Sequence, residues 1–561
     1  MKIMKNIFKL TTLALLSATL LAGCIKETFP TTGATHEQVG NSPFALEALV
    51  AGMNAALIAP GFGIGGAMHS DFSYPSMMIV REELIDLMPW YGEPGWDWFN
   101  PWGTGLGLSE RSDASAMIWN TYYPLIYSCN QIISALKGGD KNLDYLGIAY
   151  TYRALYYLDM VRMYSYKTTP HMETPVYTDA DNNIYSIEGL AVPIVTEDTT
   201  EEMAKRNPRA TEEEVYELIF SDLQEAAKCL ATYTAPSKAY PSLAVVYGLY
   251  ARAYLERAAE EPDTYYPLAA EYARKAIDAS GCSPLTQSQW EDPINGFNNM
   301  SSQNSWMFGL KQAPENVHNL LSFTGFMSGE QDWGYASIVE WDAYFKVSPS
   351  LYNSIPNSDF RKHSWIDPEG LSFYNYKVAY FDPVAFWEAV QPYAPLKFRC
   401  AQGETEDYKT GNATDIPLMR VEEMMLIEAE ATAYTNLSAA QQLLTTFMGY
   451  RMTDGSYDCS LFNSFETFQM EVIKQKKIEL WGEGLLFFDY KRLGLGLHRT
   501  GSDSLYQDYW KFDADQIAPA WNFTIPRSEI QNNAGIQANN PDPSGILKPA
   551  TSAVVINNIR K

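Results

Sequence analysis

The chain has 561 residues and a formal net charge of −26, and 46% of its residues are hydrophobic while 19% are charged. This composition is typical of a globular chain with an ordinary core and not of a disordered one. The acidic balance argues against a nucleic-acid-binding protein, which would present a basic face to the phosphates. The length allows either several domains or one long helical-repeat body.

Residues 1–23 are predicted to be a signal peptide. Three lysines precede a short apolar run, Leu10 to Ala22, which is too short to span a bilayer. The run ends in Leu21-Ala22-Gly23-Cys24, and small residues directly before a cysteine resemble the lipobox of bacterial lipoproteins. An ordinary signal peptide with a chance cysteine is the alternative. We expect acylation of Cys24, by palmitate among other chains, to anchor the protein through a tether formed by residues 24–43.

Helical patterns dominate the chain that follows. Apolar residues at helical spacing predict helices over 44–58, 77–88, 109–136, 143–164 and 211–230. Thr211 and Glu214 have the spacing of a capping box at the start of the last of these helices. Two helical pairs are expected next, 242–259 with 265–280 and 418–434 with 438–452, and a final long helix over 465–492. Small residues where paired helices would meet are typical of tetratricopeptide-like pairs.

Helical periodicity fades between residues 282 and 415, where proline, asparagine, glycine and aromatic residues become frequent. A loop-rich insertion of this length inside a helical protein is usually functional. The expected organisation is therefore a single domain over 44–561, with a helical scaffold formed by 44–281 and 416–561.

The stretch from Trp90 to Trp102 reads WYGEPGWDWFNPW, and six of its thirteen residues are aromatic. Its glycine and proline residues exclude a helix interior. Loops lie on surfaces, and clustered surface aromatics mark interaction sites. Because tryptophan is mostly buried on average, a small core under a long loop is the alternative. Flat rings beside polar side chains suit a sugar, which has apolar C–H faces and a rim of hydroxyl groups.

The residues predicted to bind a ligand come from this loop, from the insertion and from one helix. The aromatic candidates are Trp96, Trp98, Trp102, Trp306, Trp333 and Tyr335. The candidate partners for ligand hydroxyl groups are Asn100, Asp97 and Arg81.

Other motifs favour neither a metal site nor a cofactor. The sequence has no C-x-x-C or H-x-x-x-H spacing and no G-x-S-x-G motif. The glycine-rich stretch 61–66 has neither the preceding strand nor the lysine of a phosphate-binding loop. Five cysteines remain after Cys24, an odd number that does not suit a disulfide scaffold. We therefore expect no cofactor, no metal and no enzymatic activity.

Five longer motifs occur in a fixed order along the chain. They are AYTYRALYYLDMVR at 149–162, EVYELIFSDLQEA at 214–226, IPLMRVEEMMLIEAE at 416–430, IELWGEGLLFFDYKR at 478–492 and FTIPRSEIQNN at 523–533. Together with the lipobox they resemble the SusD/RagB family of outer-membrane nutrient-binding lipoproteins, over nearly the whole mature chain. The sequence departs from the family pattern at Leu486, where the family often has arginine, and at residues 537–541, where its closing motif is loosened.

The resemblance implies a mainly α-helical, tetratricopeptide-like body with a loop-rich face, held at the outer membrane and facing the cell exterior. It also implies a partner, a SusC-like TonB-dependent transporter, and capture of glycans without chemistry. Charged residues in the motifs are expected to form ion pairs in the scaffold; they are Arg420, Glu423, Glu428, Glu430, Glu483, Asp489 and Arg492. Two alternatives stay open. One is a binder of peptides or another nutrient in the same type of transporter complex. The other is a surface glycosidase, which would need two carboxylates facing one cleft.

Overall fold

A computed structural model gives the structure of residues 42–547, except for 62, 64–68, 93–98, 179–180, 296, 298, 302–303, 319, 341–342 and 369–382. The predicted signal peptide, the predicted lipid anchor Cys24 and nearly all of the predicted tether lie outside the described residues. Among the described residues, no helix combines the length and the apolar character needed to cross a membrane.

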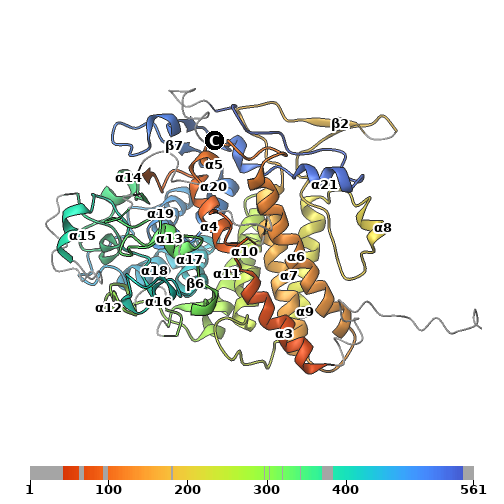
Figure 1. Cartoon of the computed structure of the whole chain (residues 1–561), viewed down its shortest axis with the longest axis horizontal. Helices are drawn as coiled ribbons and strands as arrows, with labels where there is room; N and C mark the ends of the chain where they lie inside the picture. The colour runs from red at the N-terminus through yellow and green to blue at the C-terminus, as the bar shows by residue number, and fades with distance from the viewer. Residues whose placement is uncertain are drawn as a thin grey trace, which may run out of the picture.

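The molecule is mainly helical, which confirms the predicted fold class (Figure 1). Eight helices form the scaffold, and each packs against the next along the chain. They are α6 (Asp113–Leu136), α7 (Leu143–Tyr164), α9 (Glu212–Cys229), α10 (Leu243–Arg257), α11 (Pro262–Ser280), α17 (Val421–Thr435), α18 (Leu437–Gly449) and α19 (Phe465–Glu479). Further helices are α3 (Pro43–Ala56), α4 (Tyr74–Glu83), α5 (Asn100–Gly103), α8 (Glu201–Ala204), α20 (Leu486–Leu493) and α21 (Arg527–Asn532).

Local signals position the scaffold helices as the sequence predicts. Thr211 and Glu214 form a complete capping box at the start of α9, each side chain accepting from the other residue's backbone N–H. The pair α10 and α11 meets through small residues, since Ala251, Ala269 and Ala273 are fully buried. Small side chains let the two helix axes approach closely, which supports the predicted tetratricopeptide-like pairing.

The predicted helix over 465–492 is wrong, because the chain forms two helices there. The first, α19, ends before Gly482, and α20 begins after Gly484. Both glycines have positive φ angles, 76° and 70°, in a region that other residues rarely adopt. A Cβ atom on Gly484 would lie 2.5 Å from the Cα of Met78, so the turn also needs the missing side chain for close packing.

The predicted insertion contains short elements joined by loops. They are α12 (Gln287–Trp290), β4 (Trp306–Leu310), η1 (Pro314–Asn316), α13 (Phe323–Met327), β5 (Tyr344–Phe345), α14 (Pro349–Asn353), η2 (Phe360–Ser364), α15 (Pro383–Ala389), η3 (Ala401–Gly403) and α16 (Tyr408–Gly411). Two of its strands pair with strands outside it. Strand β4 pairs antiparallel with β6 (Ile416–Arg420), and β5 pairs antiparallel with β1 (Trp90–Tyr91). The helix predicted from residue 418 therefore starts later, at Val421, after strand β6.

The remaining elements lie at the edges of the molecule. Hairpin β2–β3 (Val176–Thr178 and Ile184–Ser186) is largely exposed, and β7 (Leu497–His498) pairs with β8 (Asp513–Ala514). Two short 3-10 turns, η4 (Asp508–Trp510) and η5 (Pro519–Trp521), follow β7.

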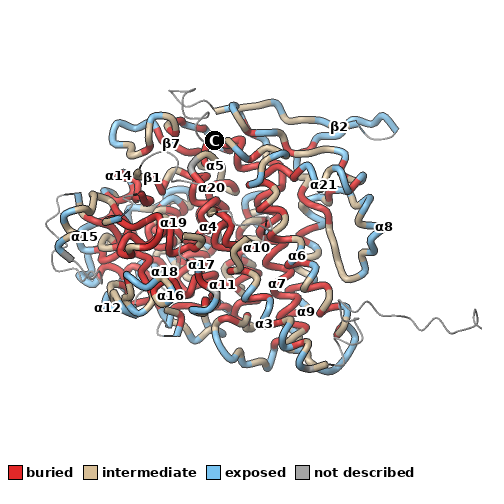
Figure 2. Tube along the Cα trace, in the orientation of Figure 1, coloured by how far each residue is buried: buried red, intermediate tan, exposed pale blue. Residues whose placement is uncertain are grey.

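One large hydrophobic core joins the scaffold to the insertion. It extends along the chain from Leu46 to Ile536 and includes Phe323 and Trp365 of the insertion. Figure 2 shows buried chain both in the long helices and on the left of the molecule, beside β1 and α14. The insertion therefore shares its core with the scaffold.

Candidate functional site

The stretch from Trp90 to Trp102, which we call the aromatic loop, is held by a strand pair at its N-terminal end. In β1, Trp90 lies opposite Phe345 of β5, and their rings meet edge to face with centroids 5.0 Å apart. Tyr91 lies opposite Tyr344, with ring centroids 5.3 Å apart. The Nζ atom of Lys346 lies 3.7 Å from the centroid of the Tyr91 ring, a cation–π contact. Tyr91 remains partly exposed, whereas Trp90 is buried.

The C-terminal end of the loop is anchored in the core. Phe99 is fully buried and packs edge to face on Trp102 of α5 and on Phe326 of α13, at centroid distances of 5.2 and 5.1 Å. Trp102 is 7% exposed, and its ring also lies against Gly107, where a Cβ atom would come within 3.1 Å. The predicted role of Trp102 as a ligand platform is therefore wrong, because its ring anchors the loop instead.

For the loop residues between these two ends, ligand binding stays a prediction. Trp96, Asp97 and Trp98 lie outside the described residues. Asn100 is the first residue of α5, and its side chain is also outside the description.

The structure contradicts the predicted role of Arg81 as a partner for ligand hydroxyl groups. Its side chain is 1% exposed, and Nη1 lies 3.0 Å from Oδ2 of Asp159. The hydroxyl groups of Tyr74 and Tyr122 donate to the same Asp159 oxygen. Burial acts to raise the pKa of Asp159, but Arg81 and Arg162 outweigh it and hold the pKa below its usual value. This cluster is an ion pair inside the core.

The three aromatic candidates from the insertion are also buried. Trp306 is 0% exposed in β4, Trp333 is 9% exposed and Tyr335 is 1% exposed. The Tyr335 ring is tilted against the rings of Phe326 and His69, at centroid distances of 4.9 and 5.6 Å. An open platform would need an exposed ring face, so the prediction is wrong for these three residues. The physical reason is that the insertion has few long helices and builds its core from large rings, which bury the most apolar area per residue.

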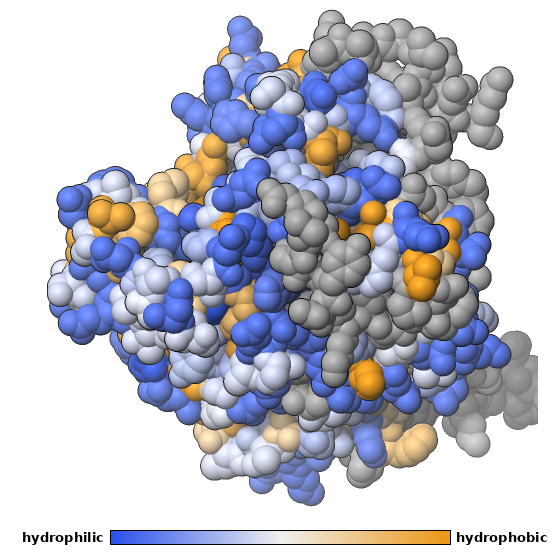
Figure 3. All heavy atoms as spheres, turned by 90° about the vertical axis from the view of Figure 1, so that its left-hand side faces the viewer, coloured by the Kyte–Doolittle hydropathy of each residue, from blue (hydrophilic) through white to orange (hydrophobic). Residues whose placement is uncertain are grey.

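A partly exposed set of apolar residues lies next to the aromatic loop instead. Five such residues pack on one small core cluster of the insertion, which contains Tyr344, Ile366 and Phe386. The five are Tyr91, Val339, Trp387, Ala389 and Val390, and we call them the aromatic edge. Figure 3 looks onto the side of the molecule that includes α15, the helix of Trp387, and shows a mostly hydrophilic face with small hydrophobic patches. Tyr91 is the residue through which the aromatic edge continues into the aromatic loop.

Sequence reasoning did not single out Tyr91 and Trp387 as candidate site residues. Both stand out in the sequence as aromatic, but so do many buried rings. The feature that distinguishes them is partial exposure on a shared cluster, and this depends on the pairing of β1 with β5. A further polar contact comes from the C-terminal part of the chain, where Nε2 of Gln507 donates to the carbonyl oxygen of Gly92 at 2.6 Å.

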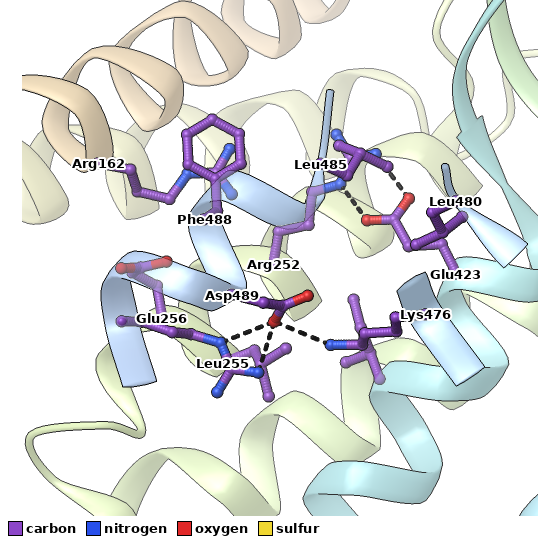
Figure 4. Close-up of a pocket in the computed structure, with 12 residues that line it drawn as sticks. Arg162, Arg252, Leu255, Glu256, Glu423, Lys476, Leu480, Leu485, Phe488 and Asp489 are labelled. Atoms are coloured by element: carbon purple, nitrogen blue, oxygen red, sulfur yellow. Dashed lines mark hydrogen bonds and ion pairs between the residues drawn. The ribbon is translucent and has the colours of Figure 1, made fainter. Parts of the chain in front are cut away.

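A second set of charged residues surrounds a small cavity between the scaffold helices (Figure 4). Glu423 pairs with Arg252 at 2.6 Å, and Asp489 pairs with Lys476 at 3.0 Å. The cavity has a volume of about 30 Å³, which is room for about one water molecule and not for a sugar.

The charged motif residues form ion pairs, as predicted. Besides the pairs at the cavity, Glu428 pairs with Arg274, Glu430 with Arg492 and Glu483 with Arg420. Their positions stabilise the contacts between scaffold helices. Within the described part of the chain, no group of three or more His, Cys, Asp or Glu side chains is placed to hold a metal ion.

Two family profiles match the sequence. One, described as "Starch-binding associating with outer membrane", matches residues 104–255, and the other, described as "SusD family", matches residues 362–542. Together these segments make up more than half of the chain. The chain is also 24% identical over 492 residues to SusD-like protein P2 of Formosa agariphila, covering 83% of this chain and 87% of that protein.

Solved structures share the fold. A SusD-like carbohydrate binding protein from Bacteroides vulgatus superposes with a TM-score of 0.67 at 19% identity, covering 88% of this chain and 96% of that one. Surface glycan-binding protein A from Bacteroides thetaiotaomicron superposes with a TM-score of 0.59 at 14% identity, covering 89% of this chain and 99% of that one. At these identities the likeness establishes the architecture.

Proposed function

Because this chain belongs to the SusD/RagB family, we propose that it is a cell-surface lipoprotein that captures oligo- or polysaccharides without catalysis. It delivers them to a SusC-like TonB-dependent transporter in the outer membrane, to which the acylated Cys24 anchors it. The family profiles and the glycan-binding relatives support glycan capture. Delivery to the transporter and the absence of chemistry follow from the family resemblance.

One observation supports the proposed location of the site. The aromatic loop is fixed at both ends, by β1 at Trp90 and by the buried ring of Trp102, so its central residues start from a rigid frame. The central residues include Trp96 and Trp98, and the partly exposed rings of Tyr91 and Trp387 lie on the adjoining aromatic edge. A rigid frame lowers the entropy cost of presenting flat rings to a ligand.

The expected affinity follows from the number of rings. Stacking contributes about 1 kcal/mol per ring, by analogy with aromatic pairs. With several rings and a few hydroxyl contacts, the Kd should lie between about 1 mM and 1 µM. Such binding suits a protein that must release its ligand to a transporter.

Affinity electrophoresis of the mature chain against plant, host and microbial polysaccharides tests the proposal. We expect at least one polysaccharide to retard the native protein, and the double variant Trp96→Ala, Trp98→Ala to lose most of that retardation. Tyr91→Ala should lose part of it. The matched control is Tyr127→Ala, because Tyr127 is 62% exposed on α6, outside the aromatic edge.

Each alternative has a distinct outcome. Undiminished retardation of the double variant would remove the loop from the binding site. No retardation by any polysaccharide would contradict glycan capture and favour a peptide or another nutrient. Release of reducing sugar by the purified protein would establish a glycosidase if a single carboxylate substitution abolished that release.

The lipid anchor has its own test. Cys24→Ala should move the protein out of the membrane fraction, and an unchanged distribution would contradict lipidation at this residue.

A further inference from the structure

A second pocket, separate from the aromatic loop and the aromatic edge, has a volume of about 370 Å³. This falls within the range of small-molecule sites, roughly 300–1,000 Å³. Three parts of the chain form it: the segment between α9 and α10, the C-terminal end of α11 and the start of β4. None of the lining residues that the structure describes belongs to the loop or the edge.

Aromatic and apolar groups form part of the lining. The side chains of Tyr233 and Tyr240 are partly exposed at the pocket. Tyr240 also packs on a small core cluster that contains Trp306 and Met300. Partly exposed rings over a buried apolar base can contact the C–H face of a sugar ring. Trp306, predicted from the sequence as an open ligand platform, thus belongs to the base of a different pocket.

The charge of the lining distinguishes this pocket in an acidic protein. Lys238 lines it, and none of the other described lining residues is Asp or Glu, although the whole chain carries a net charge of −26. Burial lowers the pKa of Lys238, which shows that its ammonium group is partly desolvated there. An anionic group beside it would favour the charged form. The described lining of this pocket thus carries a positive charge, in a chain whose net charge is −26.

The amino end of α10 adds to this positive character. Ser242 is the N-cap of the helix and lines the pocket, and its side chain makes no capping hydrogen bond. The first-turn N–H groups of a helix of 15 residues carry a partial positive charge. Lys238 and the start of α10 thus contribute charge of the same sign on one side of the pocket.

The backbone around the pocket is fixed by contacts between distant parts of the chain. Nδ2 of Asn54 in α3 donates to the Ala239 carbonyl at 3.0 Å, and the Gly309 N–H donates to the Lys238 carbonyl at 3.0 Å. On the other side, Sγ of Cys282 lies 3.3 Å from the Trp306 carbonyl. A pocket with a fixed backbone loses little entropy when it binds a ligand.

We propose that this pocket binds one anionic sugar residue, a uronate or a sulfated sugar, as a second glycan site of the protein. The carboxylate or sulfate lies toward Lys238 and the start of α10, and the sugar ring lies against Tyr233 and Tyr240. The site goes beyond the proposed capture at the aromatic loop, because it selects a charge that the loop does not require.

Isothermal titration calorimetry of the full mature chain tests this site. The probes are an oligogalacturonate, a chondroitin sulfate oligosaccharide and neutral maltohexaose. We expect at least one anionic probe to bind, and Lys238→Gln to weaken that binding at least about tenfold because a charge-assisted contact is lost. Tyr240→Ala should weaken it as well. The matched control is Lys228→Gln, since Lys228 lies on α9 with an exposed side chain and pairs with Glu225.

The same titrations in the Trp96→Ala, Trp98→Ala background separate the two proposals. The anionic probe should still bind there, whatever happens to neutral glycans at the loop. The second site is overturned if no anionic probe binds, if Lys238→Gln and Lys228→Gln behave alike, or if the background variant loses all anionic binding. It is also overturned if inorganic sulfate displaces the probe at the probe's own concentration, because the pocket would then recognise only the anion. Circular dichroism of each variant controls for folding.

Discussion

Glu430 shows how a single buried carboxylate stabilises this scaffold. Its side chain is fully buried, with one oxygen 2.6 Å from Nη2 of Arg492 and the other 2.8 Å from Nζ of Lys476. Burial acts to raise its pKa, but Arg492 and Lys476 outweigh burial and lower the pKa from 4.5 to about 2. The interaction connects α17 to the later helices α19 and α20.

We predict that Glu430 makes the protein sensitive to acid. Because its pKa is lower in the folded than in the unfolded state, its stabilisation is complete above pH 4.5 and is lost as the pH falls from 4.5 toward 2. The linked change in the free energy of unfolding is roughly 3 kcal/mol. Urea denaturation at a series of pH values measures it.

The variant Glu430→Gln should be less stable at pH 7 by about 3–5 kcal/mol, because two buried cations lose one of their anionic partners. Its stability should also change less with pH between 4.5 and 2. The control is Glu271→Gln, which removes an exposed pair with Lys275 and should cost less than about 1 kcal/mol. Equal pH profiles for native protein and Glu430→Gln would contradict the assignment.

Gly484 carries a second prediction at the residue scale. Gly484→Ala should destabilise the protein by about 1–3 kcal/mol. Alanine disfavours the positive φ angle, and its Cβ atom would overlap Met78. Chemical denaturation provides the measurement. The matched substitution Gly449→Ala, at the end of α18 with no atom within 4 Å of the added Cβ, should change stability little. A similar loss in both variants would exclude the close packing as the cause.

At the scale of elements, periodicity predicted where most helices lie but not where packing interrupts them. The helix predicted over 143–164 coincides with α7, and the capping box of α9 forms as expected. In contrast, the pattern over 465–492 continues through two glycines that break the helix. Residues 418–420 also carry a helical pattern, yet they pair with β4 as part of strand β6. Neighbours from elsewhere in the chain override local preference at these places.

The aromatic loop gives a prediction about preorganisation. Gln507 Nε2 donates to the Gly92 carbonyl, directly before the loop's central residues. Gln507→Ala should weaken glycan binding severalfold, because a less ordered loop pays more entropy on binding. Its Tm should stay within about 2 °C of the native value, since one hydrogen bond to a surface loop adds little to global stability.

Differential scanning fluorimetry and affinity electrophoresis measure the two quantities on one preparation. Gln224→Ala, an exposed glutamine on α9, is the control. A Gln507→Ala variant with unchanged affinity would show that the loop is ordered without this contact.

At the scale of the whole molecule, the scaffold and the insertion share one core. Trp365 and Phe323 of the insertion belong to the same cluster as Leu46 of α3 and Ile536 near the C-terminus. Two of the described two-stranded sheets also join the insertion to other parts of the chain. We therefore predict that residues 44–547 unfold in a single cooperative transition.

Differential scanning calorimetry tests this prediction through the ratio of the calorimetric to the van't Hoff enthalpy, which should be close to one. Limited proteolysis within 282–415 should then yield no folded scaffold fragment. Two resolved transitions would contradict the shared core and indicate an insertion that folds independently.

The sequence by itself determined the helical class, the tetratricopeptide-like pairs, the charged motifs and the family. These features depend on local spacing, on caps and on motifs that can be read along one stretch of chain. Only the tertiary structure decided which aromatic rings are exposed at the surface. Trp306 lies opposite Arg420 in a strand pair and its ring is buried, whereas the rings of Tyr91 and Trp387 stay partly exposed on one cluster. Exposure depends on neighbours brought together from distant segments, and no local pattern carries that information.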